Sequence, residues 1–182
     1  MNIRIIIVLL LLLLSCSDNK FSWYDGTFDN ALNQVSTQKD KILFLDFYSD
    51  NWGACVKLDA ETLSDERVID FSKTHFISKK LKLWDDEKNS ELFSKYQGSG
   101  IPLLVFLNSE GEEIDRLLGF YPPDQFITQV TKIVQGVDTY LSLKKQYLSG
   151  DTSSELLSKL SYKCDNGSHE LLCEEVYSTI IS

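Results

Sequence analysis

The sequence predicts an α/β domain with a mixed central sheet flanked by helices, followed by a C-terminal helical appendage. The short, strongly apolar segment 41–49 is typical of a buried central strand. Residues 103–118 predict a hairpin, with a first strand at 103–107, a turn at Asn108–Gly111 and a returning strand. The order helix, strand, helix, strand, helix, strand, strand, helix places helices on both faces of one sheet.

The first helices are predicted from apolar spacing and from capping residues. Residues 28–38 carry apolar side chains at helical spacing, with Thr27 as N-cap. Residues 55–63 are predicted to be helical, and a further helix over 64–76 begins at the cap Ser64.

The rest of the domain continues the alternation of strand and helix. Residues 76–84 alternate apolar side chains with lysines and predict a second strand. A polar loop passes into a short helix within 85–97, which the glycines of 98–100 stop. Residues 122–134 form an amphipathic pattern with prolines at its start, where a helix tolerates them.

Gly136 marks the predicted boundary between the domain, residues 23–136, and a helical tail, residues 137–182. Three helical patterns follow it, separated by turn signals, at residues 137–148, 152–164 and 168–181. The last two patterns predict a helical hairpin whose apolar faces need a surface to cover.

The amino terminus predicts an exported protein with residues 1–15 as a signal peptide. Arg4 precedes the apolar run Ile5–Leu14, which as a helix would span about 15 Å, roughly half of a hydrocarbon core. The end of this segment, Leu-Leu-Ser-Cys16, resembles the lipobox of bacterial lipoproteins. The resemblance implies that Cys16 is lipidated, becomes the first residue of a polar tether over 16–22, and holds the protein to a membrane of the bacterial envelope. A plain signal peptide and an uncleaved anchor are the alternatives.

Composition excludes several classes of partner. The net charge of the 182 residues is −9, and no cluster of Lys or Arg is present, so we predict no nucleic-acid partner. His75 and His169 are isolated and match no ligand spacing, so we predict no metal site. No cofactor is predicted.

Four separated motifs resemble the thioredoxin family. They are Leu-Asp-Phe at 45–47, the segment 55–68 with its Glu-Thr and Ser-Asp pairs, Gly-Ile-Pro at 100–102, and the hairpin. Their order and spacing over Trp23–Val134 resemble most the exported branch that includes the soluble domain of the transmembrane thiol-disulfide interchange protein. The resemblance implies a buried aspartate at Asp46 and a cis peptide bond before Pro102.

The sequence departs from this family at the redox motif. The family's first cysteine lies six residues after the buried aspartate, which is Trp52 here, and the second lies at Cys55. Dithiol exchange needs a thiolate at the helix N-terminus to attack the substrate disulfide and a second thiol to resolve the product. Because an indole carries no ionisable sulfur, we predict that ordinary two-cysteine turnover is lost.

Two interpretations of the remaining thiol stay open. In the first, Cys55 forms mixed disulfides as a single thiol, and Asp46 accepts its proton. In the second, Cys55 is a small buried hydrophobic residue and Asp46 is a relic of the fold, hydrogen-bonded to water or to Lys57.

The functional hypotheses follow from these interpretations. The favoured hypothesis is a membrane-anchored module that binds a protein or peptide partner near Trp52, Ile101 and Pro102, with little or no dithiol activity. The alternative is a thiol-disulfide oxidoreductase that acts through Cys55. A third possibility is that the tail carries the binding surface.

The remaining cysteines, Cys164 and Cys173, flank the turn between the last two helical patterns. Antiparallel helices joined this closely bring the two positions together, which predicts a structural disulfide. A relocated redox pair is the alternative.

Overall fold

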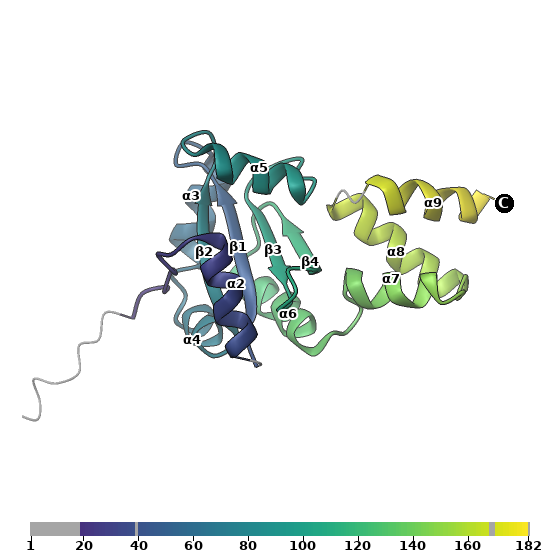
Figure 1. The fold of residues 1–182 in the computed structure, drawn as a ribbon, viewed down its shortest axis with the longest axis horizontal. Coiled ribbons are helices and arrows are strands. Elements are labelled where there is room, and N and C mark those ends of the chain that lie inside the picture. The colour runs from purple at the N-terminus through teal and green to yellow at the C-terminus, as the bar shows by residue number, and fades with distance from the viewer. Residues whose placement is uncertain (1–18, 39, 168–169, 182) are drawn as a thin grey trace, which may run out of the picture.

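The computed structural model describes residues 19–38, 40–167 and 170–181, and it confirms the predicted fold class (Figure 1). A four-stranded sheet has the order β2-β1-β3-β4. The pair β1–β2 is parallel, whereas β1–β3 and β3–β4 are antiparallel. The strand bounds are Ile42–Tyr48 for β1, Phe76–Lys82 for β2, Leu103–Leu107 for β3 and Glu113–Leu118 for β4.

Helices cover both faces of this sheet. On one face, α2 and the end of α5 pack on side chains such as Leu45 and Val105. On the other face, η1, α4 and α6 pack on Phe44 and Phe106. The bounds are Phe28–Thr37 for α2, Gly53–Lys57 for α3, Leu58–Thr62 for η1, Glu66–His75 for α4, Glu87–Lys95 for α5 and Pro123–Gln135 for α6.

The central strand β1 is covered from both sides, as its run of apolar residues predicts. Successive side chains of a strand point to opposite faces, so Phe44 lies in one hydrophobic cluster and Leu45 in the other. Phe44 faces Phe106 across the antiparallel pair, and their stacked rings have centroids 5.1 Å apart. Aromatic pairs of this kind stabilise a core beyond the area that they bury.

Two local predictions are corrected by the structure. Residues 55–63 do not form one α-helix, because α3 passes into the π-helix η1, in which the Leu63 amide donates to the Leu58 carbonyl. The N-cap of α4 is Asp65 instead of Ser64. Asp65 accepts from the Arg67 amide at 2.9 Å, whereas the Ser64 hydroxyl donates to the Ala60 carbonyl. The predicted cap Thr27 is confirmed at the start of α2.

Three helices form the C-terminal tail beside the edge strand β4 (Figure 1). They are α7 at Tyr140–Leu148, α8 at Ser154–Gly167 and α9 at Glu170–Ile181. Both α7 and α8 pack against β4, so the predicted apolar faces find their cover there and in each other. Within the described part of the chain, none of the helices has the length and apolarity needed to cross a bilayer.

Truncation of Phe44 is expected to be among the most destabilising core substitutions. Its ring is fully buried and contacts the rings of Phe76, Phe106 and Phe126. We expect Phe44→Ala to lower the free energy of unfolding by about 3–5 kcal/mol, measured by urea denaturation. Leu148→Ala, at a side chain that is 64% exposed, is the control and is expected to change it by less than about 0.5 kcal/mol. Equal effects of the two substitutions would contradict this account of the core.

Candidate functional site

Three loops meet at one end of the sheet. β1 ends at Tyr48 and leads to Trp52, and the Leu83 amide after β2 donates to the Tyr48 carbonyl. β3 runs the opposite way and pairs Leu103 with Phe47, so Pro102 comes to the same end. The topology therefore gathers residues from three distant parts of the chain around the start of α3.

Trp52 lies at the N-cap of α3 with its side chain 55% exposed. Its backbone is extended, and its carbonyl accepts from the amides of Cys55 and Val56, which start the helix. A helix N-terminus stabilises an anion through its free N–H groups and dipole. The side chain at this position is an indole, which cannot become an anion, so the helix start has no nucleophile of its own to activate.

Cys55 lies one turn into α3 and is only 2% exposed. Burial raises the pKa of the Cys55 thiol, and the nearby carboxylates of Asp46 and Asp59 raise it further. A hydrogen bond with the Ser49 backbone and the charge of Lys80 lower this pKa without reversing the shift. Because the thiolate is the reactive form, a buried thiol with a raised pKa is a weak nucleophile.

Asp46 is buried in the middle of β1, as the resemblance implies, and its charged form is poorly compensated. Its Oδ1 has no hydrogen-bond partner within the described residues, and its Oδ2 lies 3.9 Å from the Nζ of Lys80. Burial raises the pKa of Asp46 to about 7, and the positive charge of Lys80 opposes this shift.

The cation beside Asp46 is Lys80, and not Lys57, which is one of the two partners considered for a structural Asp46. The parallel register places Lys80 directly across from Asp46, and its Nζ donates to both carboxylate oxygens of Asp59 at 2.6 Å. The Nζ of Lys57 instead lies over the Phe120 ring, 4.3 Å from its centroid. Asp59 thus holds Lys80 in a strong ion pair and leaves Asp46 with a longer contact.

The loop before β3 contributes backbone to the site. The peptide bond between Ile101 and Pro102 is cis. Pro102 is buried and its carbonyl accepts from the Gly119 amide at 2.8 Å, whereas Ile101 is half-buried. This fixes the loop against the hairpin, and Ile101 packs partly against the hydrophobic core.

Trp84 is a residue that the sequence analysis missed. It follows β2 at the same end of the sheet, is 73% exposed and has a φ of +67°, a conformation that is strained for a bulky side chain. Lys82 forms ion pairs with two aspartates of this loop region. Its Nζ lies 2.7 Å from Asp50 Oδ2 and 2.5 Å from Asp85 Oδ2. A strained, exposed aromatic residue points to a binding role. The sequence shows an aromatic residue at the strand end, but exposure and φ depend on the tertiary fold.

The other predicted site residues lie elsewhere. Cys164 and Cys173 are joined by a disulfide, with their Cα atoms 5.6 Å apart, and both are buried in the tail. Cys16 lies outside the described residues. No group of three or more potential metal ligands is found among the residues that the structure describes.

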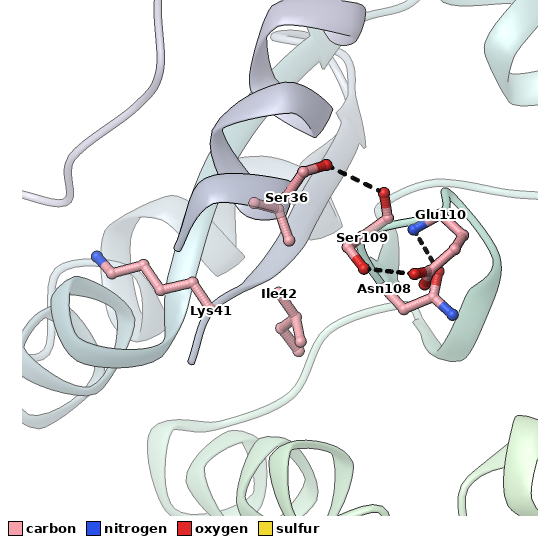
Figure 2. Close-up of a pocket in the computed structure, with 7 residues that line it drawn as sticks. Ser36, Lys41, Ile42, Asn108, Ser109 and Glu110 are labelled. Atoms are coloured by element: carbon pink, nitrogen blue, oxygen red, sulfur yellow. Dashed lines mark hydrogen bonds between the residues drawn. The ribbon is translucent and has the colours of Figure 1, made fainter. Parts of the chain in front are cut away.

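Two cavities of the described structure are lined by residues other than Trp52, Cys55 and Pro102. A cavity of about 460 Å³ lies between α2 and the turn of the hairpin, at the opposite end of the sheet (Figure 2). Its wall is the turn itself, where the Ser36 hydroxyl donates to the Ser109 carbonyl at 3.4 Å. A second cavity, of about 760 Å³, lies along β2 between α2 and α5. Trp52 itself lies on the exposed surface.

Comparison with known proteins agrees with the fold described above. A family model described as a thioredoxin-like domain matches residues 28–133. The thiol:disulfide interchange protein DsbD of Pasteurella multocida (strain Pm70) is 30% identical over 105 residues, which are 56% of this chain and 18% of that protein. The chain thus matches less than a fifth of the length of this relative.

Two solved structures have the same fold. The solution structure of a proposed disulphide isomerase from Bacteroides thetaiotaomicron is 28% identical, with a TM-score of 0.56, over 64% of this chain and 94% of that one. The oxidised C-terminal domain of DsbD from Neisseria meningitidis is 23% identical, with a TM-score of 0.51, over 62% of this chain and 97% of that one. The second likeness concerns the fold alone.

Asp46 is expected to make stability depend on pH near neutrality. Its pKa is about 7 in the folded chain and near 4 when unfolded, so between these values only the folded state holds the proton. Its contribution to stability is therefore present at low pH and is lost as the pH rises through 7. Between pH 5 and pH 8 this loss amounts to about 2–3 kcal/mol.

Asp46→Asn is the test, because it keeps the shape and removes the charge. Urea denaturation is carried out on the wild type and the variant at pH 5 and pH 8. The free energy of unfolding of the variant is expected not to show this loss, so the difference between variant and wild type changes in favour of the variant as the pH rises. Leu148→Ala, at an exposed side chain without an ionisable group, is the control and is expected to show the pH dependence of the wild type. An identical pH dependence in wild type and Asp46→Asn would show that Asp46 does not titrate in this range.

Proposed function

This chain belongs to the thioredoxin-like family, and on that premise we propose that it is a membrane-anchored, extracytoplasmic module that binds a protein or peptide partner and has little or no dithiol redox activity. The observation that carries the proposal is Trp52 at the N-cap of α3, followed by a Cys55 that is buried. Attack on a disulfide needs an exposed thiolate at this helix start. The chain has an indole there instead.

The proposed binding surface consists of Trp52, Trp84 and Ile101. The two indoles are exposed, and Ile101 precedes the cis peptide bond at the same end of the sheet. Tryptophan side chains often supply a large part of the binding energy at protein interfaces. A partner segment lying across this end of the sheet would cover the exposed parts of both indoles.

The proposed location follows from the amino terminus and from the tail. Lipidation at Cys16 would hold the module to the envelope membrane, because each buried CH₂ of an acyl chain contributes about 0.8 kcal/mol. The disulfide between Cys164 and Cys173 fits an oxidising compartment, where such bonds persist. The similarity to proteins named for thiol:disulfide interchange also supports an extracytoplasmic site.

The second candidate function is that of an oxidoreductase acting through Cys55. It is favoured by Asp46, whose pKa of about 7 and whose electrostatic contact with Cys55 suit a group that accepts a proton from the thiol. In this scheme the Cys55 thiolate would attack a partner disulfide, and a thiol of another protein would resolve the mixed disulfide.

Reduction of insulin by dithiothreitol separates the two candidates. We expect the wild-type chain to give no more turnover than Cys55→Ser, because the attacking thiol is missing. Trp52→Cys places two thiols three residues apart at the helix start and is expected to give turnover well above both. Wild-type turnover that disappears in Cys55→Ser would favour the oxidoreductase. If the two thiols of Trp52→Cys cannot form a disulfide with each other, the alignment of Trp52 with the family's first cysteine is wrong.

Binding is tested with carboxymethylated insulin B chain, an extended peptide without free thiols. Titration monitored by NMR is expected to shift the signals of Trp52, Trp84 and Ile101, and the substitutions Trp52→Ala and Trp84→Ala should each weaken binding about fivefold or more. Tyr162→Ala, at an exposed aromatic residue of the tail, is the matched control and should bind as the wild type does. Shifts confined to the tail would move the binding surface there.

A further inference from the structure

We propose that the C-terminal tail positions the loop that leads into Ile101 and Pro102, and that Arg116 of β4 is the positioning residue that connects them. The inference rests on the proposed function in one respect, namely that this loop contributes to the partner surface. It makes the tail a working part of the site instead of an independent appendage. The family model ends at residue 133, so the tail is not part of the matched domain.

Arg116 is buried, and each N–H group of its guanidinium donates a hydrogen bond. Its side chain is 3% exposed, and its Nε and Nη2 donate to the two carboxylate oxygens of Glu113, both at 2.5 Å. Nη2 also donates to the Tyr96 carbonyl at 2.7 Å. Nη1 donates to the carbonyls of Gly167 at 2.9 Å and Gln97 at 3.5 Å. A guanidinium has five N–H groups in a fixed plane, and all five have acceptors here.

The backbone acceptors of Arg116 are the ends of two helices that come from different parts of the chain. Tyr96 and Gln97 follow the last residue of α5, and Gly167 is the last residue of α8. The final carbonyls of a helix have no partner within the helix and carry its partial negative charge. One buried cation thus caps both helices, and it joins the tail to the domain through the same planar group.

The end of α5 determines where the loop begins. Gln97 has a φ of +50°, an unusual value for a residue other than glycine. Its amide donates to Ser94, and the Gly98 amide donates to Phe93, a pattern that ends a helix in a tight reversal. Only three residues separate Gln97 from Ile101, so the bond from Arg116 acts directly on the segment that presents Ile101 and Pro102.

Two further contacts hold the end of α8 close to Arg116. The Nζ of Lys163 donates to Asp115 Oδ2 at 2.5 Å, next to Arg116 in β4, and both side chains are largely buried. Cys164, the next residue of α8, forms the disulfide with Cys173 of α9. These contacts fix the last turn of α8, and with it the Gly167 carbonyl that faces Arg116.

Hydrogen exchange of the full chain tests the connection without any partner. We expect Arg116→Lys to accelerate at least tenfold the exchange of the Gln97 and Gly98 amides, which are hydrogen-bonded to the Ser94 and Phe93 carbonyls, while amides of β1 stay within about twofold of wild type. A lysine ammonium cannot reproduce five planar donors. The double substitution Cys164→Ser with Cys173→Ser is expected to accelerate the same amides. Lys159→Ala, which removes two ion pairs of partly exposed side chains, with Asp138 and with Glu155, is the matched control and should leave them unchanged.

Faster exchange confined to the tail, with the Gln97 and Gly98 amides as protected as in wild type, would overturn the proposal. If Arg116→Lys does not fold, the exchange rates of the same amides in the double serine variant test the proposal instead. A second measurement uses carboxymethylated insulin B chain, for which Arg116→Lys is expected to have about fivefold lower affinity than Lys159→Ala. Absence of B-chain binding by the wild type would count against the proposed function alone, because the exchange result does not depend on it.

Discussion

The burial of β1 on both faces is the constraint on which the rest of the structure depends. A strand in this position must be apolar along most of its length. Phe44 and Leu45 pack into the two hydrophobic clusters on its opposite faces. Asp46 is the exception. Its desolvated carboxyl has a pKa of about 7, and its nearest cation, Lys80, is already paired with Asp59. The chain therefore retains an energetic cost in its core at the position of Asp46.

At the end of β1 the backbone geometry of the helix start is kept, but the side chain at that position is an indole. The helix N-terminus, the cis peptide bond before Pro102 and the thiol one turn into the helix are all present. The position that would need an ionisable sulfur holds the indole of Trp52. The same geometry that favours an anion at the helix start instead displays a large aromatic surface to solvent. Binding and disulfide exchange have different requirements, and we propose that this end of the sheet serves binding.

The tail solves a problem that the sheet creates. An edge strand such as β4 exposes unpaired backbone groups and invites association with other chains. Here α7 and α8 lie against β4, and buried charges of that strand, Asp115 and Arg116, are satisfied by Lys163 and by the end of α8. Polar groups buried in this way are specific, because each has one arrangement that satisfies it. The tail is therefore attached in a defined position, next to the loop of the site.

The sequence alone determined the fold class, the central strand and the hairpin, because these depend on residue type and on spacing along the chain. Only the tertiary structure decided which cation faces Asp46. The parallel register of β1 and β2 puts Lys80 there, and no local pattern encodes a cross-strand neighbour. The exposure and positive φ of Trp84 also needed the fold. So did three contacts of Arg116, since Tyr96, Gln97 and Gly167 lie far from it in sequence and meet it only when strands and helix ends are brought together.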